Sequence, residues 1–263
     1  MPSNPFFRFK QFIVHQDKTA MKVGTDGVLL GSIVGTIPCT PFLFPQFQSP
    51  NPTVLDIGTG TGLIALMMAQ RLPQAKVTAI DIDPDAVTQA TDNVAQSPFA
   101  SQICVLQTDI RHLPTQRFNI IVSNPPYFVQ SLTCPSDQRT TARHVTDFDH
   151  RELVNQIARL LAPNGLAAII LPHECAPQID AYARQVGLAI VSQTNIFTTK
   201  RKPAKRVVLQ LVWQELIPEM QNCLLQFANE LPISTDVILL QSDGSMSVEY
   251  KELCRDFYLD SQN

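Results

Sequence analysis

Leu55-Asp56-Ile57-Gly58-Thr59-Gly60-Thr61-Gly62 is the stretch that decides the fold, because a short apolar run ends there in three spaced glycines. The residues from Thr53 to Ile57 are mostly apolar and rich in β-branched side chains, which predicts a buried strand. The residues from Leu63 to Leu72 carry apolar side chains on successive turns and stop at Pro73, which predicts a helix. A strand, a glycine-rich turn and a helix in this order are typical of a nucleotide-binding α/β unit.

The same alternation of strand and helix continues along the chain. Further strands are predicted at Lys76–Asp81, Ile103–Gln107, Phe118–Ser123, Leu166–Leu171, Leu188–Thr194 and Arg206–Gln214. Helices are predicted to begin at Asp83-Pro84-Asp85, to run from Asp149 or His150 to Leu161, and to cover Cys175–Val186. Helices of about ten or more residues between strands imply right-handed crossovers, so the pattern predicts a largely parallel sheet with helices on both faces.

Two segments lie outside this α/β core. Residues 1–50 are predicted to be an N-terminal extension packed on the core, residues 51–215 the core itself, and residues 216–263 a C-terminal appendage. The appendage is expected to contain a strand at Val237–Gln241 and a helix at Ser247–Phe257. Neither segment is large enough to count as an independent domain, so we expect a single domain overall.

The composition limits the classes of function. No segment approaches the roughly 20 apolar residues of a membrane-spanning helix, and the N-terminus lacks the apolar core of a signal peptide, so a cytoplasmic protein is expected. Six cysteines are scattered without a CxxC pair, which argues against a zinc site, and no metal is expected. A net charge of −3 excludes a strongly basic coat for nucleic acid but permits a local basic patch.

The glycine spacing indicates which nucleotide the turn binds. Dinucleotide sites have the spacing GxGxxG and hold a pyrophosphate, whereas Gly58, Gly60 and Gly62 are spaced GxGxG. Asp56 at the strand end would repel a phosphate but suits a ligand with an ammonium group. S-adenosylmethionine carries an amino-acid head, a sulfonium and no phosphate, so it is the expected cofactor. Two alternatives remain: NAD, and a purely structural turn.

Two further carboxylates support this interpretation, because they follow the next strands at the same sheet edge. Asp81 ends the second strand and is placed to accept hydrogen bonds from both ribose hydroxyls. Asp109 comes just after the third strand and is expected to receive the adenine amino group of the cofactor. Open α/β sheets bind ligands at this edge.

Asn124-Pro125-Pro126-Tyr127 follows the fourth strand and indicates methylation of a planar exocyclic nitrogen. The lone pair of such a nitrogen is delocalised, so it is a weak nucleophile until acceptors draw both N–H bonds out of the plane. Asn124 offers its side-chain carbonyl, and Pro125 offers a backbone carbonyl whose orientation the next proline restricts. Tyr127 offers an aromatic face for the base. A neutral amide is not a base, so the role expected of Asn124 is to position and polarise the target amino group. The structural alternative is that the four residues form a turn that merely ends a strand.

Together these residues resemble the class I methyltransferases that carry an N-P-P-Y signature, and among them the bacterial tRNA adenine-N6 methyltransferases. The resemblance covers nearly the full chain and rests on Phe9-Lys10-Gln11-Phe12, the block from Ala20 to Gly31, the glycine turn, Asn93 with Gln96-Ser97-Pro98, the N-P-P-Y residues and Phe257-Tyr258-Leu259. It implies a Rossmann-like, mostly parallel sheet of seven strands in the order 3-2-1-4-5-7-6, with S-adenosylmethionine as methyl donor. It also implies that the substrate is the adenine that follows the anticodon of a valine tRNA.

The same resemblance suggests that Lys22 and Asp26 lie near the cofactor pocket; the alternative is that they cap the helix that follows. For the tRNA, contact with phosphates is expected from the basic run that precedes the last core strand and from two arginines after the N-P-P-Y residues: Lys200, Arg201, Lys202, Lys205, Arg206, Arg139 and Arg143. The structural alternative for the basic run is a solvent-exposed loop without a role in RNA binding. The run is more basic, and the Pro38–Pro52 connection longer, than the family pattern predicts.

Three other functions compete. Protein glutamine-N5 methyltransferases share the N-P-P-Y residues, but they resemble chains with a sizeable helical domain ahead of the glycine turn, where this chain has 55 residues before Asp56. Methylation of a base amino group in rRNA or DNA is the second alternative, although DNA enzymes usually add a large recognition domain. The third is a non-catalytic RNA-binding module, against which intact Asp56, Asp81 and Asn124 argue.

Overall fold

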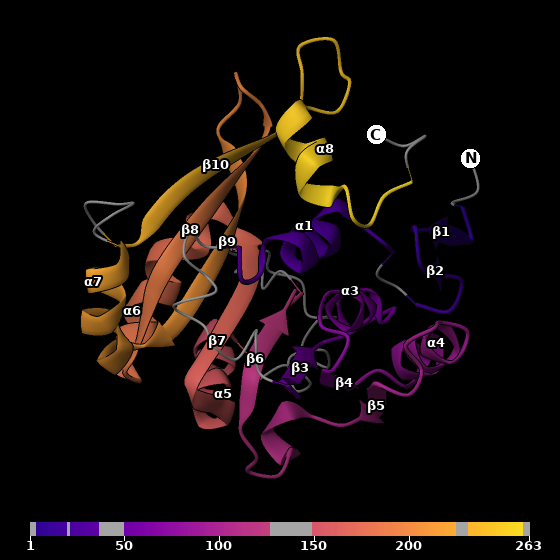
Figure 1. Cartoon of the computed structure of the whole chain (residues 1–263), viewed down its shortest axis with the longest axis horizontal. Helices are drawn as coiled ribbons and strands as arrows, with labels where there is room; N and C mark the ends of the chain where they lie inside the picture. Colours follow the sequence, from indigo (N-terminus) through magenta and orange to yellow (C-terminus); the bar gives the residue numbers. More distant parts are fainter. Residues whose placement is uncertain (1–3, 20–21, 37–49, 127–148, 225–230, 260–263) are drawn as a thin grey trace, which may run out of the picture.

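A computed structural model describes residues 4–19, 22–36, 50–126, 149–224 and 231–259. Eight strands form one sheet: β3 (Thr53–Ile57), β4 (Lys76–Asp81), β5 (Ile103–Gln107), β6 (Phe118–Ser123), β7 (Leu161–Pro172), β8 (Leu188–Thr199), β9 (Ala204–Trp213) and β10 (Ile233–Leu240). Their spatial order is β10-β8-β9-β7-β6-β3-β4-β5, and Figure 1 shows the sheet crossing the molecule. Only β9 runs antiparallel to its neighbours β7 and β8.

Counted from β3 as strand 1, the predicted order 3-2-1-4-5-7-6 is confirmed. The predicted number of seven strands is wrong, because β10 adds an eighth strand at the outer edge of β8, in parallel, with Ile233 opposite Ser192. The sequence indicated a strand here but not its partner, since pairing between distant segments leaves no mark in a local pattern. The three-part division of the chain stays a prediction.

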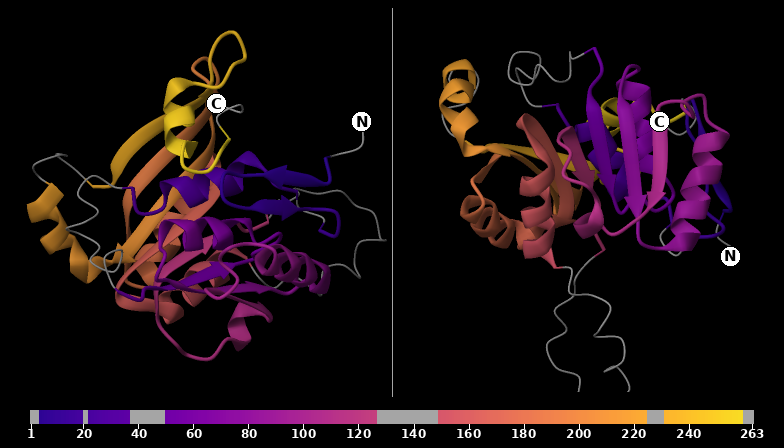
Figure 2. Two further views of the ribbon diagram at one scale, coloured as in Figure 1. Left: turned by 45° about the vertical axis from the view of Figure 1, so that its right-hand side comes forward. Right: turned by 90° about the horizontal axis from the view of Figure 1, so that it is seen from below.

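Helices cover both faces of the sheet (Figure 2). One apolar core contains residues of α1 (Thr25–Ile33), α3 (Leu63–Arg71), α4 (Pro84–Ala95) and α8 (Val248–Cys254). The other lies beneath α5 (His150–Leu160) and α6 (Ala176–Gln185). The described part of the chain also contains the helix α7 (Ile217–Leu224) and three short 3-10 turns at Ile110–His112, His173–Cys175 and Gln214–Leu216.

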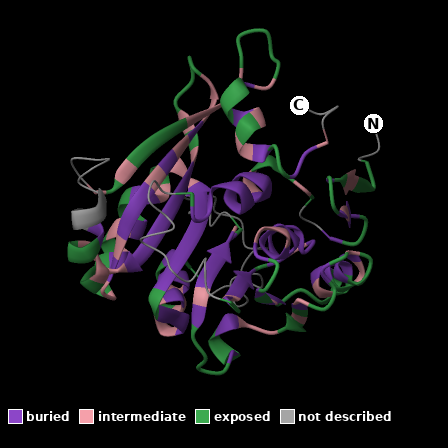
Figure 3. Ribbon diagram, in the orientation of Figure 1, coloured by how far each residue is buried: buried purple, intermediate pink, exposed green. Residues whose placement is uncertain are grey.

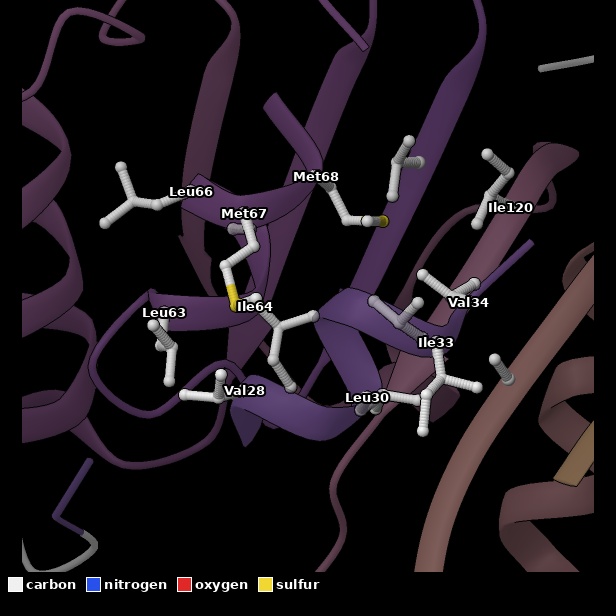
Figure 4. Packing of buried hydrophobic residues seen from close by; sticks show 14 of the residues in the cluster. Val28, Leu30, Ile33, Val34, Leu63, Ile64, Leu66, Met67, Met68 and Ile120 are labelled. Carbon is white, nitrogen blue, oxygen red and sulfur yellow. The ribbon is translucent and has the colours of Figure 1, made fainter. Parts of the chain in front are cut away.

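The helix α1 is part of the core, as the buried colouring of Figure 3 shows. It packs on α3, and Val28 and Leu30 of α1 belong to the same apolar cluster as Ile64 of α3 (Figure 4). A Cβ atom at Gly31 would lie 2.5 Å from the sulfur of Met67, so a larger residue there would require the Met67 side chain to move. This contact holds the second turn of α1 beside the second turn of α3.

The two ends of the described chain meet on this face. The strands β1 (Phe6–Arg8) and β2 (Ile13–His15) form an antiparallel hairpin. Phe9, in its turn, stacks on Tyr258 with ring centroids 6.0 Å apart, and the N–H of Lys10 donates to the carbonyl of Phe257. The N-terminal hairpin is therefore packed against the C-terminal residues.

Several local predictions are confirmed by side-chain caps. Asp83 accepts a hydrogen bond from the N–H of Asp85 at the start of α4, and Asp149 accepts one from Glu152 at the start of α5. The helix α7 was not predicted. Among the described residues, no helix has both the length and the apolar character needed to cross a bilayer.

Candidate active site

The glycine loop between β3 and α3 opens at the carboxyl edge of the sheet, the edge at which the parallel strands end. Gly58 and Gly60 have φ angles of +70° and +56°, a left-handed conformation that glycine adopts without steric cost. A Cβ atom at either position would meet nothing within 4 Å. The N–H groups of Gly58 and Thr59 donate to the carbonyl of Ile80 and hold the loop against β4. A ligand can therefore approach this backbone closely.

The far end of the loop is held by α4. Gly62 has a φ angle of +80°, which favours glycine, and a Cβ atom there would be in van der Waals contact with Ala90 of α4 at 3.4 Å. Asn93, which is fully buried, donates from Nδ2 to the carbonyl of Thr61 at 2.9 Å and to that of His15 at 2.9 Å. Its Oδ1 accepts the N–H of His15 at 2.9 Å. Asn93 thus joins the N-terminal hairpin to the glycine loop, a role that sequence reasoning missed.

Asp56 lies beneath the loop and is fully buried, rather than facing solvent. Its Oδ2 accepts hydrogen bonds from the Thr59 hydroxyl at 2.6 Å and from the Ala65 N–H at 3.2 Å. Burial raises the pKa of Asp56 to about 7, against the opposing effect of these two bonds. Within the described part of the chain, the buried Oδ1 has no hydrogen-bond partner. That oxygen is a vacant acceptor directly under the loop.

Asp81 connects the end of β4 to the same loop. Its Oδ2 accepts the N–H of Gly60 at 2.9 Å, and its Oδ1 accepts the N–H of Asp83 at 3.0 Å. The side chain is half-exposed. Because each carboxylate oxygen has two acceptor sites, each retains one for a ligand hydroxyl.

Ile82 is a second residue that sequence reasoning missed. It follows Asp81 directly, and 63% of its surface is exposed, which is unusual for so large an apolar side chain. The available signal was an isoleucine between two aspartates just after a strand. Ile82 offers an apolar surface beside the carboxylate expected to bind the ribose.

Asp109 stands at the carboxyl edge beyond β5, as predicted, but both of its oxygens are already engaged. Arg111 donates to them from its backbone N–H at 2.8 Å, from Nε at 3.0 Å and from Nη2 at 2.6 Å. Hydrogen bonding by the Arg111 side chain lowers the pKa of Asp109. The carboxylate is therefore ionised and has little acceptor capacity left for an adenine amino group.

Asn124 emerges at the carboxyl end of β6, next to β3. The preceding residue, Ser123, pairs with Ile57 and donates from its hydroxyl to the Ile57 carbonyl at 3.0 Å. Asn124 is half-buried, Pro125 is buried and Pro126 is exposed. Among the described residues, the side chain of Asn124 makes no hydrogen bond. As far as the described residues extend, its amide is available to a ligand, one strand away from the glycine loop.

Four of the predicted site residues are not placed at this site by the structure. Tyr127, Arg139 and Arg143 lie outside the described residues. Lys22 is exposed and donates to the carbonyl of Gln16.

Asp26 lies in the first turn of α1 and pairs with Nε of Arg206 on β9 at 2.9 Å. The helix has Gly24 at its N-cap and no side-chain cap, so neither Lys22 nor Asp26 caps it. The neighbouring Gly27 places this turn near the glycine loop, since a Cβ atom there would lie 3.0 Å from Leu63 at the start of α3.

The basic residues Lys200–Arg206, called the basic hairpin below, connect β8 to β9. Because β8 runs in the same direction as β7, this hairpin projects from the carboxyl edge, at the top of Figure 1. Lys200, Arg201 and Lys202 are exposed, whereas Arg206 is partly buried beside Asp26. The hairpin therefore presents positive charge on the same edge as Asn124. No group of three or more metal-ligating side chains is found in the described ranges.

Comparison with known proteins gives a consistent result. Residues 38–175 match the family model described as "Methyltransferase small domain". The chain is 40% identical to the tRNA1(Val) (adenine(37)-N6)-methyltransferase of Bacteroides thetaiotaomicron, over 98% of each chain. It is 37% identical to the protein of the same name from Vibrio cholerae, over 97% of this chain and 96% of the relative.

Solved structures show the same fold at low sequence identity. The predicted O-methyltransferase Atu636 from Agrobacterium tumefaciens superposes with a TM-score of 0.58 at 17% identity, covering 88% of this chain and 96% of that one. The transferase PH0793 from Pyrococcus horikoshii gives 0.54 at 14% identity, covering 78% and 70%. These likenesses concern the fold alone.

Proposed function

The chain belongs to the tRNA1(Val) (adenine(37)-N6)-methyltransferases within the methyltransferase small-domain family, and we propose that it methylates N6 of adenine 37 in that tRNA. The observation that carries the proposal is Asn124. Its half-buried amide makes no side-chain hydrogen bond within the described part of the chain and stands one strand from an open glycine loop. A planar amino nitrogen needs an acceptor at that place.

S-adenosylmethionine is the methyl donor of this family, and it supplies an electrophilic methyl group when bound. The residues at the carboxyl edge of the sheet fit this cofactor. The backbone of Gly58 and Gly60 faces open space, and Gly62 is the N-cap residue of α3 directly after it. Asp81 retains two acceptor sites for the ribose hydroxyls. The vacant Oδ1 of Asp56 lies under the loop, where it would complement the cationic amino-acid end.

The adenine end of the cofactor is assigned to the strip between Ile82 and Asp109. Ile82 offers an apolar face for the ring, and its exposure is then explained. Because Arg111 occupies the Asp109 carboxylate, Asp109 would accept the adenine amino group only if the Arg111 side chain turned away. Lys22 and Asp26 would border the amino-acid end, close to the first turn of α3.

For the reaction itself, we assign positioning and polarisation to the N-P-P-Y residues. The Asn124 carbonyl and the Pro125 backbone carbonyl would accept the two N–H groups of the target amino group, so that its lone pair points at the methyl group. Pro126 restricts the conformation of Pro125. Tyr127 would stack on the base, for a contribution of about 1–3 kcal/mol. No general base is required, because the proton leaves to solvent after transfer.

For the tRNA, the basic hairpin would contact phosphates on the carboxyl edge, together with Arg139 and Arg143. A base beside an anticodon lies in a single-stranded loop, so it reaches the site at a lower unstacking cost than a base in a duplex. Free tRNA is the substrate in this proposal, and the protein would act in the cytoplasm.

The decisive experiment incubates the protein with S-adenosylmethionine labelled on the methyl group and with total bacterial tRNA, followed by nucleoside analysis. N6-methyladenosine in one valine tRNA, lost in an Asn124→Ala variant, is the expected result. Label in protein alone would point to a side-chain amide as substrate. Cofactor binding without transfer to any RNA would point to a non-catalytic binding module.

A further inference from the structure

A cleft of about 660 Å³ lies beside the candidate active site, on the face of the sheet that α1 covers. Its lining comes from the first turn of α1, the ends of β8 and β10, the start of β9, the strand β1, the helix α8, and the residues Met246 and Tyr258. The volume is in the range of small-molecule pockets, roughly 300–1,000 Å³. Of the residues assigned above to the cofactor, Asp26 alone also lines this cleft, and the described N-P-P-Y residues and the glycine loop do not.

The chemistry of the lining is apolar with a charged rim. Phe7, Leu239 and Met246 are each only half-buried, so they present apolar surface to the cleft. Lys205 is exposed at the rim, next to the Asp26–Arg206 ion pair. A bare anion would meet the Asp26 carboxylate and apolar walls. A flat heterocycle with N–H groups, attached to a phosphate that can reach Lys205, matches all of these features.

The position of the cleft relative to Asn124 follows from the strand register. Arg206 on β9 is opposite Pro172 on β7, and Ser123 on β6 is opposite Ile169 on β7. The rim is therefore two strands across and two residues along from Asn124, roughly 12 Å at the usual strand spacing and rise. A neighbouring nucleotide of a single-stranded loop spans a distance of that order.

We propose that this cleft receives the base of a nucleotide adjacent to the target adenine, stacked against Phe7, with its phosphate near Lys205. This inference rests on the proposed function and deepens it. It assigns to the space between α1, α8 and β8–β10 a share in choosing the RNA, in addition to the phosphate contacts of the basic hairpin.

The test fills the cleft without touching the reaction site. Ile196 and Thr198 line the cleft whereas Phe197 and Thr199 do not, because alternate residues of a strand face opposite sides. Thr198→Phe therefore inserts a ring into the cleft, and Thr199→Phe is the matched control on the other face. Both variants are compared with wild type for binding of S-adenosylmethionine and of an anticodon stem-loop of the valine tRNA. The stem-loop is used intact and with either neighbour of the target adenine made abasic.

We expect Thr198→Phe to weaken binding of the intact stem-loop about tenfold, the order of one stacked base, while cofactor affinity stays that of wild type. One abasic stem-loop should bind wild type about tenfold more weakly, and Thr198→Phe should weaken it no further. 2-Aminopurine at that same nucleotide should lose fluorescence on binding wild type and Thr199→Phe, but not Thr198→Phe.

Provided that wild type methylates the RNA, either of two results would overturn the inference. One is that Thr198→Phe weakens binding of the intact and of the abasic stem-loops equally. The other is that Thr198→Phe binds the intact stem-loop as tightly as wild type does. If wild type transfers no methyl group to the stem-loop or to tRNA, the proposed function itself fails, and this inference fails with it.

Discussion

Removal of the Asp81 carboxylate is expected to weaken binding of S-adenosylmethionine by about two orders of magnitude. Each carboxylate oxygen already accepts one backbone N–H, from Gly60 or from Asp83, and keeps one acceptor site for a ribose hydroxyl. A hydrogen bond to a charged group contributes about 1.5–3 kcal/mol. The lower end applies because the side chain is half-exposed, so two bonds give about 3 kcal/mol, or roughly 150-fold in Kd.

The assay is isothermal titration of S-adenosylmethionine and of S-adenosylhomocysteine into Asp81→Ala. The matched control is Asp83→Ala, two residues away, which loses the helix cap to the Asp85 N–H and should lose about 1 kcal/mol of stability without a change in cofactor affinity. A cofactor analogue without the 2′-hydroxyl should bind wild type more weakly but bind Asp81→Ala no more weakly than the normal cofactor. Equal cofactor affinity in Asp81→Ala and Asp83→Ala would refute the assignment.

Four other expectations concern single features of the site. Asn124→Ala should keep its cofactor affinity while single-turnover methyl transfer falls about 100-fold or more, and a loss of cofactor binding would show the residue to be misassigned. Because the pKa of Asp56 is raised to about 7 in the folded protein, its contribution to stability is complete below about pH 3.9 and is lost as the pH rises through about 7. In urea unfolding, the free energy of unfolding of Asp56→Asn should therefore rise relative to that of wild type by up to about 1.4 kcal/mol per pH unit in that window. Parallel pH dependences of the two proteins would contradict this. Reversing the charges of Lys200, Arg201 and Lys202 should flatten the slope of log K for tRNA against log salt by about 2, and an unchanged slope would remove the basic hairpin from the RNA contact. Asn93→Leu should lower the free energy of unfolding by more than about 2 kcal/mol, because it leaves the Thr61 carbonyl and both backbone groups of His15 without their partner; stability equal to wild type would contradict this.

The central part of the fold was predictable because its signals are local. From β3 to α4, β-branched runs, a glycine turn and an Asp-Pro helix start lie next to the elements they define, and the predicted and observed bounds agree closely. The strand β7 begins earlier than predicted, through Pro163-Asn164-Gly165, where the pairing with β6 is irregular. Pro163 and Asn164 are exposed there, so the missing N–H of the proline has no ladder to interrupt.

Within the site, the sequence indicated which residues gather at the carboxyl edge but not how their hydrogen bonds are shared. The burial of Asp56 and the capture of Asp109 by Arg111 depend on side-chain packing, which no spacing rule describes. The function of Asn93 depends on a contact with His15, far away in the chain. Ile82 was recognisable only by its exposure, a property of the folded molecule.

The contact between Phe9 and Tyr258 has a consequence for biosynthesis. The ribosome makes the N-terminal hairpin first, and domains tend to fold as they emerge. Here the partners of that hairpin, Phe257 and Tyr258, are translated only after all strands of the sheet. Through Asn93, the same hairpin holds the glycine loop. Nascent chains that end before Tyr258 would therefore expose aromatic surface to chaperones and proteases, and competence to bind the methyl donor would mark chains that have passed through that residue.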